Sequence, residues 1–171
     1  MRQYLIKKGN HYCSMSIFEK LGAIGWKIKK HTVKFRFHPD CYWAPERNND
    51  DSDLNKLTGI SYGMNVHSNS VRLTWRPDFN NPGTIEIFGY TYDEAAVAPK
   101  FSSLKITSVQ VGQLVDACIV SDGNHYDFTV NKVTASMPNT NTDPNLCLRL
   151  YPYFGGNNTA PQDMTIDIDY L

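Results

Sequence analysis

The sequence lacks an apolar run long enough to cross a bilayer, and its first eight residues contain no hydrophobic signal region. We therefore expect no membrane partner, and synthesis in the cytoplasm without a signal peptide. It also lacks a charge excess, because Lys plus Arg and Asp plus Glu number 17 each in 171 residues. A domain that binds duplex nucleic acid through phosphate contacts normally carries a basic face, so this balance argues against a nucleic-acid partner.

Motifs for metal ions and nucleotides are missing as well. The sequence contains no Cys-x-x-Cys pair, no His-Glu-x-x-His pattern and no Gly-rich phosphate loop, so we predict no cofactor. Residues 50–53 and 122–124 offer oxygen ligands for calcium, and turn formation is the alternative explanation of both stretches. Without a signal region, we predict reduced core thiols rather than disulfides for the four scattered cysteines: Cys13, Cys41, Cys118 and Cys147.

What the chain has instead is alternation of apolar and polar residues, the pattern of half-buried strands. Residues 32–38 show it most clearly, with Val33, Phe35 and Phe37 on one face. In the closing stretch, the leucines of 146–150 are expected to enter the core together. Similar patterns predict further strands at 57–64, 71–76, 84–92, 103–109, 113–120, 125–130 and 164–168.

Helices are not expected. Residues 17–29 have the length for a short helix, but Gly22 and Gly25 oppose it, so we predict a loop or an edge strand there. Roughly ten short strands with regular turn signals predict an all-β fold, a two-sheet antiparallel sandwich formed by a single domain over residues 1–171.

Two segments resemble known families. Residues 113–131, QLVDACIVSDGNHYDFTVN, are similar to the paired strands of laminin-G-like and concanavalin-like jelly rolls. The closing run YPYFGGNNTAPQDMTI at 151–166 resembles small, signal-less β-sandwich proteins of Bacteroidetes and their phages, and KKGNHY at 7–12 also fits them. This resemblance implies a concanavalin-like jelly roll, located on a virion as a capsid decoration or fibre component or acting as a glycan-binding module, with protein partners in an oligomeric assembly.

The polar faces of the predicted strands supply the candidate site. If these strands share one sheet, their exposed face forms a cationic, tyrosine-lined groove, in which Arg and Lys meet carboxylates or sulfates and aromatic rings stack on sugars. The alternative is an ordinary solvated face with cross-strand pairs such as Arg72 with Glu86. The candidate ligand-binding residues are Arg36, His38, Trp43, Arg72, Arg76, Glu86, Tyr90, Arg149 and Tyr151.

The tryptophans are interpreted differently from one another. Trp75 alternates with apolar neighbours and is predicted in the core. Trp43 lies in the long loop 39–55 and is the best candidate for an exposed contact. Before Gly155, the pair Tyr153 and Phe154 is either a loop anchor or a partner surface.

The leading functional prediction is a non-enzymatic structural or binding protein with lectin-like glycan binding and no catalytic residues. The alternative is a carbohydrate-active enzyme such as a polysaccharide lyase acting on acidic glycans, with Arg72, His67, Tyr90 and Tyr151 as its cation and base. The motifs expected of concanavalin-like alginate lyases are absent: Arg-x-Glu-x-Arg, Gln-Ile/Val-His and Tyr-x-Lys-x-Gly-x-Tyr. A retaining glycosidase needs two close carboxylates, and Glu86 stands alone on its strand.

Overall fold

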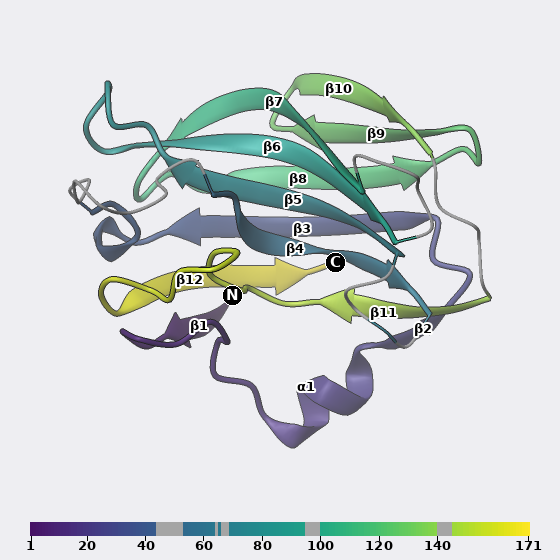
Figure 1. The fold of residues 1–171 in the computed structure, drawn as a ribbon, viewed down its shortest axis with the longest axis horizontal. Coiled ribbons are helices and arrows are strands. Elements are labelled where there is room, and N and C mark those ends of the chain that lie inside the picture. Colours follow the sequence, from purple (N-terminus) through teal and green to yellow (C-terminus); the bar gives the residue numbers. More distant parts are fainter. Residues whose placement is uncertain (44–52, 64, 66–68, 95–99, 140–144) are drawn as a thin grey trace.

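Two antiparallel sheets of six strands each form the protein in a computed structural model that describes residues 1–43, 53–63, 65, 69–94, 100–139 and 145–171 (Figure 1). The first sheet runs, in spatial order, through β1 (Arg2–Ile6), β12 (Met164–Tyr170), β3 (Lys30–Phe37), β8 (Val115–Ser121), β9 (His125–Val130) and β10 (Val133–Pro138). The second sheet runs through β2 (Ile24–Trp26), β11 (Leu146–Leu150), β4 (Asn55–Tyr62), β5 (Asn69–Pro77), β6 (Thr84–Asp93) and β7 (Phe101–Gln110). The predicted all-β jelly-roll sandwich is confirmed.

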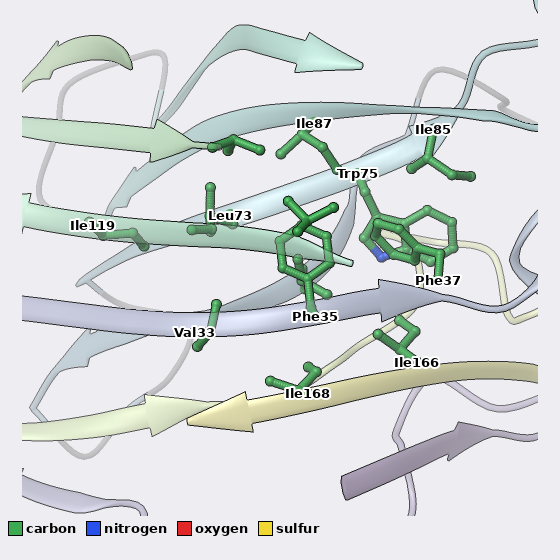
Figure 2. Close-up of a cluster of buried hydrophobic side chains, with 14 of the residues drawn as sticks. Val33, Phe35, Phe37, Leu73, Trp75, Ile85, Ile87, Ile119, Ile166 and Ile168 are labelled. Atoms are coloured by element: carbon green, nitrogen blue, oxygen red, sulfur yellow. The ribbon is translucent and has the colours of Figure 1, made fainter. Parts of the chain in front are cut away.

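The core lies between the sheets, where alternate side chains of both inner faces interdigitate. In β3, Phe35 and Phe37 point toward β5 of the opposite sheet, and the ring centroids of Phe37 and Trp75 lie 4.9 Å apart (Figure 2). Trp75 is fully buried, as predicted. The register of β12 on β3 places Ile166 beside Phe37 and Ile168 beside Phe35, which extends the same apolar layer.

One short helix, α1 (Ile17–Gly22), forms where the sequence predicted a loop or an edge strand, and β2 follows it (Figure 1). Its first turn explains the difference. The Ser16 amide donates to Glu19 Oε2 at 2.7 Å, and the Glu19 amide donates to Ser16 Oγ at 3.3 Å, which is a reciprocal cap of the helix N-terminus. This cap outweighs the low helix propensity of Gly22. A three-residue 3₁₀ turn spans Pro39–Cys41, and β10 was not predicted.

The strand β11 faces the opposite way from the prediction. Cys147 is fully buried, and the guanidinium carbon of Arg149 lies 4.7 Å from the ring centroid of Tyr170 in the first sheet. Leu148 and Leu150 instead line a cavity on the outer face of the second sheet. The chain before β2 pairs along the edge of β11, where the Arg149 amide donates to Ala23 O at 2.7 Å. Cys147 and Leu150 are buried on opposite faces of β11, so alternation could not say which face points inward.

The four cysteines are free, and Cys118 alone among them is partly exposed while the other three are buried. Among the residues placed by the structure, no helix has the length and apolar character needed to span a membrane.

Candidate functional site

Charged and aromatic side chains meet in a cavity of about 200 Å³ on the outer face of the second sheet. We call it the cationic cavity; its lining residues are Lys56, Arg72, Tyr90, Tyr92, Tyr153, Gly155 and Gly156. Strand register explains the grouping, since Arg72 on β5 lies opposite Gly59 on β4 and Tyr90 on β6. Tyr153 pairs with Lys56 as an isolated bridge beside the start of β4.

Lys56 extends into this cavity as a partly desolvated cation. Its Nζ donates to Gly155 O at 2.9 Å and lies 5.7 Å from the centroid of the Tyr90 ring. Burial and, second to it, the nearby charge of Arg72 together lower the pKa of Lys56 to about 8, while Asp53 opposes both effects. The amine therefore exchanges its proton close to neutral pH.

Arg72 is the second cation of the cavity, with only 7% of its surface exposed. Its Nε donates to Ser70 Oγ at 3.0 Å. Burial lowers the pKa of Arg72 to about 10, so its guanidinium stays charged at neutral pH. Gly59 makes room for it, because a Cβ at position 59 would lie 2.7 Å from the Cα of Arg72.

The loop after β11 forms the remaining wall. Gly155 adopts a φ of +69°, which a side chain would strain, and its amide donates to Asn55 Oδ1 at 2.7 Å. Asp53 Oδ2 accepts from the Gly156 amide at 3.0 Å. Phe154 is buried and anchors the loop, whereas Tyr153 lines the cavity and stacks on His11 at 5.2 Å between ring centroids.

The tyrosines of the cavity are protonated at neutral pH. Burial raises the pKa of Tyr90 and of Tyr153, while the charge of Arg72 opposes the shift in both. Their hydroxyls therefore carry a proton, and their rings are of the kind on which sugar rings stack.

A second cavity of about 310 Å³ adjoins the first, since Arg72 and Tyr153 line both. We call it the apolar cavity. Its other lining residues come from β11, the loop after it and the chain around α1: Tyr12, Met15, Lys20, Ala23, Ile24, Leu148, Arg149, Leu150, Tyr151 and Pro152. We refer to the two neighbouring cavities together as the groove, the first being its cationic end and the second its apolar end.

The structure brings four of the predicted site residues to this groove. Arg72 and Tyr90 line its cationic end. Arg149 and Tyr151 border its apolar end, although the Arg149 guanidinium and the Tyr151 ring both contact Tyr170 of the first sheet. Tyr151 also donates from its hydroxyl to Glu19 O at 3.0 Å, which ties the groove to α1.

Arg76 and Glu86 lie farther along the same face of the second sheet. Arg76 Nε lies 2.7 Å from Glu86 Oε2, and Lys105 forms an ion pair with the other carboxylate oxygen. The cross-strand pair of Glu86 is therefore with Arg76, not with Arg72 as in the solvated-face interpretation.

Two predicted residues lie on the other sheet. Arg36 projects from β3, and its guanidinium contacts Asp167 Oδ2 at 2.6 Å; His38 Nε2 lies 3.0 Å from the same oxygen. The condition that all the polar faces share one sheet is therefore not met for Arg36 and His38. The strand of Arg36, β3, and the strand of Arg72, β5, belong to different sheets. Alternation in the sequence cannot reveal which sheet contains a strand.

The prediction of Trp43 as an exposed contact is wrong. Trp43 is 8% exposed, and its ring centroid lies 5.9 Å from that of Trp75 and 5.5 Å from that of Phe154. Its indole closes one end of the core, so the polar loop around it is anchored by burial of an aromatic ring.

Three side chains of the cationic cavity were not among the candidate ligand-binding residues: Lys56, Tyr92 and Tyr153. Lys56 precedes the strand predicted from residue 57, and Tyr153 lay in a predicted loop. The sequence did contain a signal for Lys56. It is a lysine directly before the buried Leu57, and a lysine that alternates with core residues points to the outer face of its sheet.

Parts of the earlier expectations fall outside the described residues, namely His67 and positions 50–52 of the acidic stretch. Asp122 acts in a turn, where its Oδ1 accepts from the amides of Asn124 at 2.7 Å and His125 at 2.6 Å. Within the described ranges, no group of three His, Cys, Asp or Glu side chains is placed to hold a metal ion. The prediction of no cofactor, with calcium as its alternative, stays a prediction.

No family model and no curated protein matches this sequence. Solved structures match its fold. Alginate lyase AlyC3 aligns with a TM-score of 0.57 and 7% identity, over 100% of this chain and 70% of its own. Alginate lyase vAL-1 from Chlorella virus gives 0.53 and 11%, over 98% and 81%. SCLam, a non-specific endo-β-1,3(4)-glucanase of family GH16, gives 0.55 and 12%, over 85% of this chain and 57% of its own.

Sequence identities this low show the fold alone. The concanavalin-like jelly roll expected from the sequence is thus confirmed, and it is a fold that polysaccharide lyases and a glucanase share. The chain spans a little more than half of the glucanase.

Proposed function

We propose that the groove on the second sheet binds a polysaccharide that carries carboxylates, with one uronate carboxylate held in the cationic cavity. The observation that carries this proposal is the presence of Lys56 and Arg72 in the same cavity. Two like charges that are both desolvated cost folding free energy, as their lowered pKa values indicate. An anion bound between them offsets that cost, and such sites are typical of function.

The surroundings of the two cations suit a sugar ligand. Tyr90 and Tyr153 line the same cavity as Lys56 and Arg72. Their rings provide stacking faces, and their protonated hydroxyls provide donors to sugar oxygens. The fold likeness to structures named as alginate lyases supports a uronate polymer as the first ligand to test.

The test compares two lysine variants by calorimetric titration with alginate oligosaccharides. Lys56→Gln removes the cation from the cavity, and we expect affinity to fall about tenfold or more, since a hydrogen bond to a charged group contributes roughly 1.5–3 kcal/mol. Lys34→Gln is the matched control, because Lys34 lies on the first sheet and contacts Asp116 at 3.4 Å. Equal affinities for both variants would contradict the proposal.

A second candidate function is cleavage of the bound polymer by β-elimination. The observation that favours it is the pKa of Lys56, about 8, beside the cation Arg72. Arg72 neutralises the uronate carboxylate and so acidifies the C5 proton, which the neutral Lys56 amine takes. The C4–O4 bond breaks as the C4=C5 double bond forms, and a cavity tyrosine hydroxyl protonates the leaving oxygen.

Lys56→Arg separates binding from cleavage. Arginine keeps the positive charge but holds its proton at neutral pH. We expect this variant to bind alginate while forming no unsaturated product, which is followed by its ultraviolet absorbance. Absence of product from the wild-type protein leaves a binding module and excludes the elimination.

A place on a virion or in another assembly stays a prediction. The apolar side chains available to such contacts include Phe18, which is 81% exposed, and Trp26, which is 66% exposed. Light scattering of the untagged protein tests it, and a stable monomer would argue against an assembly formed by this chain alone.

A further inference from the structure

The apolar cavity is positioned to receive a second part of the ligand held in the cationic cavity. Arg72 and Tyr153 line both cavities. A sugar whose carboxylate contacts Arg72 therefore has its neighbouring groups at the mouth of the apolar cavity. A single ligand that occupies both cavities would be anionic at one point and apolar at the next.

The walls of the apolar cavity indicate what that second part is. Leu148, Leu150, Ile24 and Met15 present hydrocarbon to it. A bare sugar hydroxyl buried against such walls loses its water without gaining a partner, which costs affinity. A methyl group buried there gains affinity, roughly fourfold for a single carbon.

We propose that the polysaccharide is O-acetylated and that the apolar cavity holds the acetyl group beside the bound carboxylate. This inference rests on the proposed function and specifies its substrate class. The acetyl methyl packs against Leu148 and Leu150, and Lys20 on the same wall is a donor for the ester carbonyl. The volume of about 310 Å³ exceeds that of an acetyl group and also admits part of the sugar that carries it.

The test uses one polymer in two chemical states, O-acetylated alginate and the same sample after mild alkaline removal of its acetyl esters. Calorimetric titration of the whole protein is expected to give about tenfold tighter binding of the acetylated polymer, from the buried methyl and the carbonyl hydrogen bond together. Leu148→Asn is expected to abolish this preference, so that the variant binds the acetylated and the deacetylated polymer with equal affinity.

Leu104→Asn is the matched control. Leu104 lies on β7 of the same sheet, is 43% exposed and lines neither cavity. This variant is expected to keep the full preference for the acetylated polymer. Loss of that preference in Leu104→Asn would overturn the inference. If a peptide or another apolar partner occupies the apolar cavity instead, the wild-type protein will bind both polymers with equal affinity.

The outcomes separate the two proposals. Equal affinity of the wild-type protein for the two polymers overturns the acetyl inference and leaves the carboxylate site standing. No binding of either polymer overturns both. Tighter binding of the acetylated polymer that depends on Leu148 supports both.

Discussion

Replacing Lys56 by methionine is expected to make the protein more stable at pH 7 while it removes ligand binding. Methionine fills nearly the same volume without a charge, so the cavity no longer contains two desolvated cations. A lysine that serves only the fold would give the opposite result, because its removal would lose a hydrogen bond and gain nothing.

The magnitude follows from the pKa of Lys56, which falls from its ordinary 10.5 to about 8. Each pKa unit corresponds to roughly 1.4 kcal/mol, so the desolvated charge costs about 3 kcal/mol at pH 7. Partial exposure reduces this to about 2 kcal/mol. Loss of the hydrogen bond to Gly155 O costs about 1 kcal/mol. The variant is therefore expected to gain about 1 kcal/mol in free energy of unfolding.

The pH dependence gives a sharper signature. Between pH 8 and pH 10.5 the folded wild-type protein binds fewer protons at Lys56 than the unfolded chain, so its stability rises with pH relative to the variant. The assay is urea unfolding of both proteins at pH 7 and pH 9.5, followed by tryptophan fluorescence. A variant less stable than wild type at pH 7, or a difference that is the same at both pH values, would refute the reasoning.

Three further predictions concern the fold. Burial lowers the pKa of His31 to about 4, so the free energy of unfolding of the wild-type protein should fall by about 2 kcal/mol from pH 8 to pH 5. Thermal unfolding should show that His31→Gln lacks this part of the pH dependence. Gly59→Ala should lower the free energy of unfolding measured with urea by about 1–3 kcal/mol, because its Cβ would lie 2.2 Å from Val71 O. Gly22→Ala has open space around it and should be neutral or slightly stabilising. Equal effects of the two substitutions would contradict this. Iodoacetamide should modify Cys118 first, and mass spectrometry that finds a buried thiol modified faster would show local opening.

Alternation in the sequence was sufficient for most of the strands and for the sandwich, although it missed β10 and gave the wrong inward face for β11. Val33, Phe35 and Phe37 are buried as their spacing predicted, and Trp75 lies among them. Local propensity failed at α1, where the cap between Ser16 and Glu19 compensates for glycine. Such a cap is readable in sequence, but only if a helix is considered there at all.

The candidate site was predictable only in part. Arg72 and Tyr90 were identified because they alternate with core residues on adjacent strands, and the structure places them in one cavity. Lys56 and Tyr153 meet them through pairing between β4 and a loop about a hundred residues later, which leaves no local pattern. Arg36 was assigned to the same face because alternation gives a side of a strand but not which of two sheets contains it.

The most direct test of the account is a calorimetric comparison of alginate oligosaccharides with the same oligosaccharides after reduction of their carboxylates to alcohols. The two ligands differ only in the group that Lys56 and Arg72 are proposed to hold. The account predicts that the wild-type protein binds the carboxylated form, that binding weakens as pH rises through 8, and that the reduced form does not bind. Equal binding of both forms would contradict a carboxylate site in the cationic cavity.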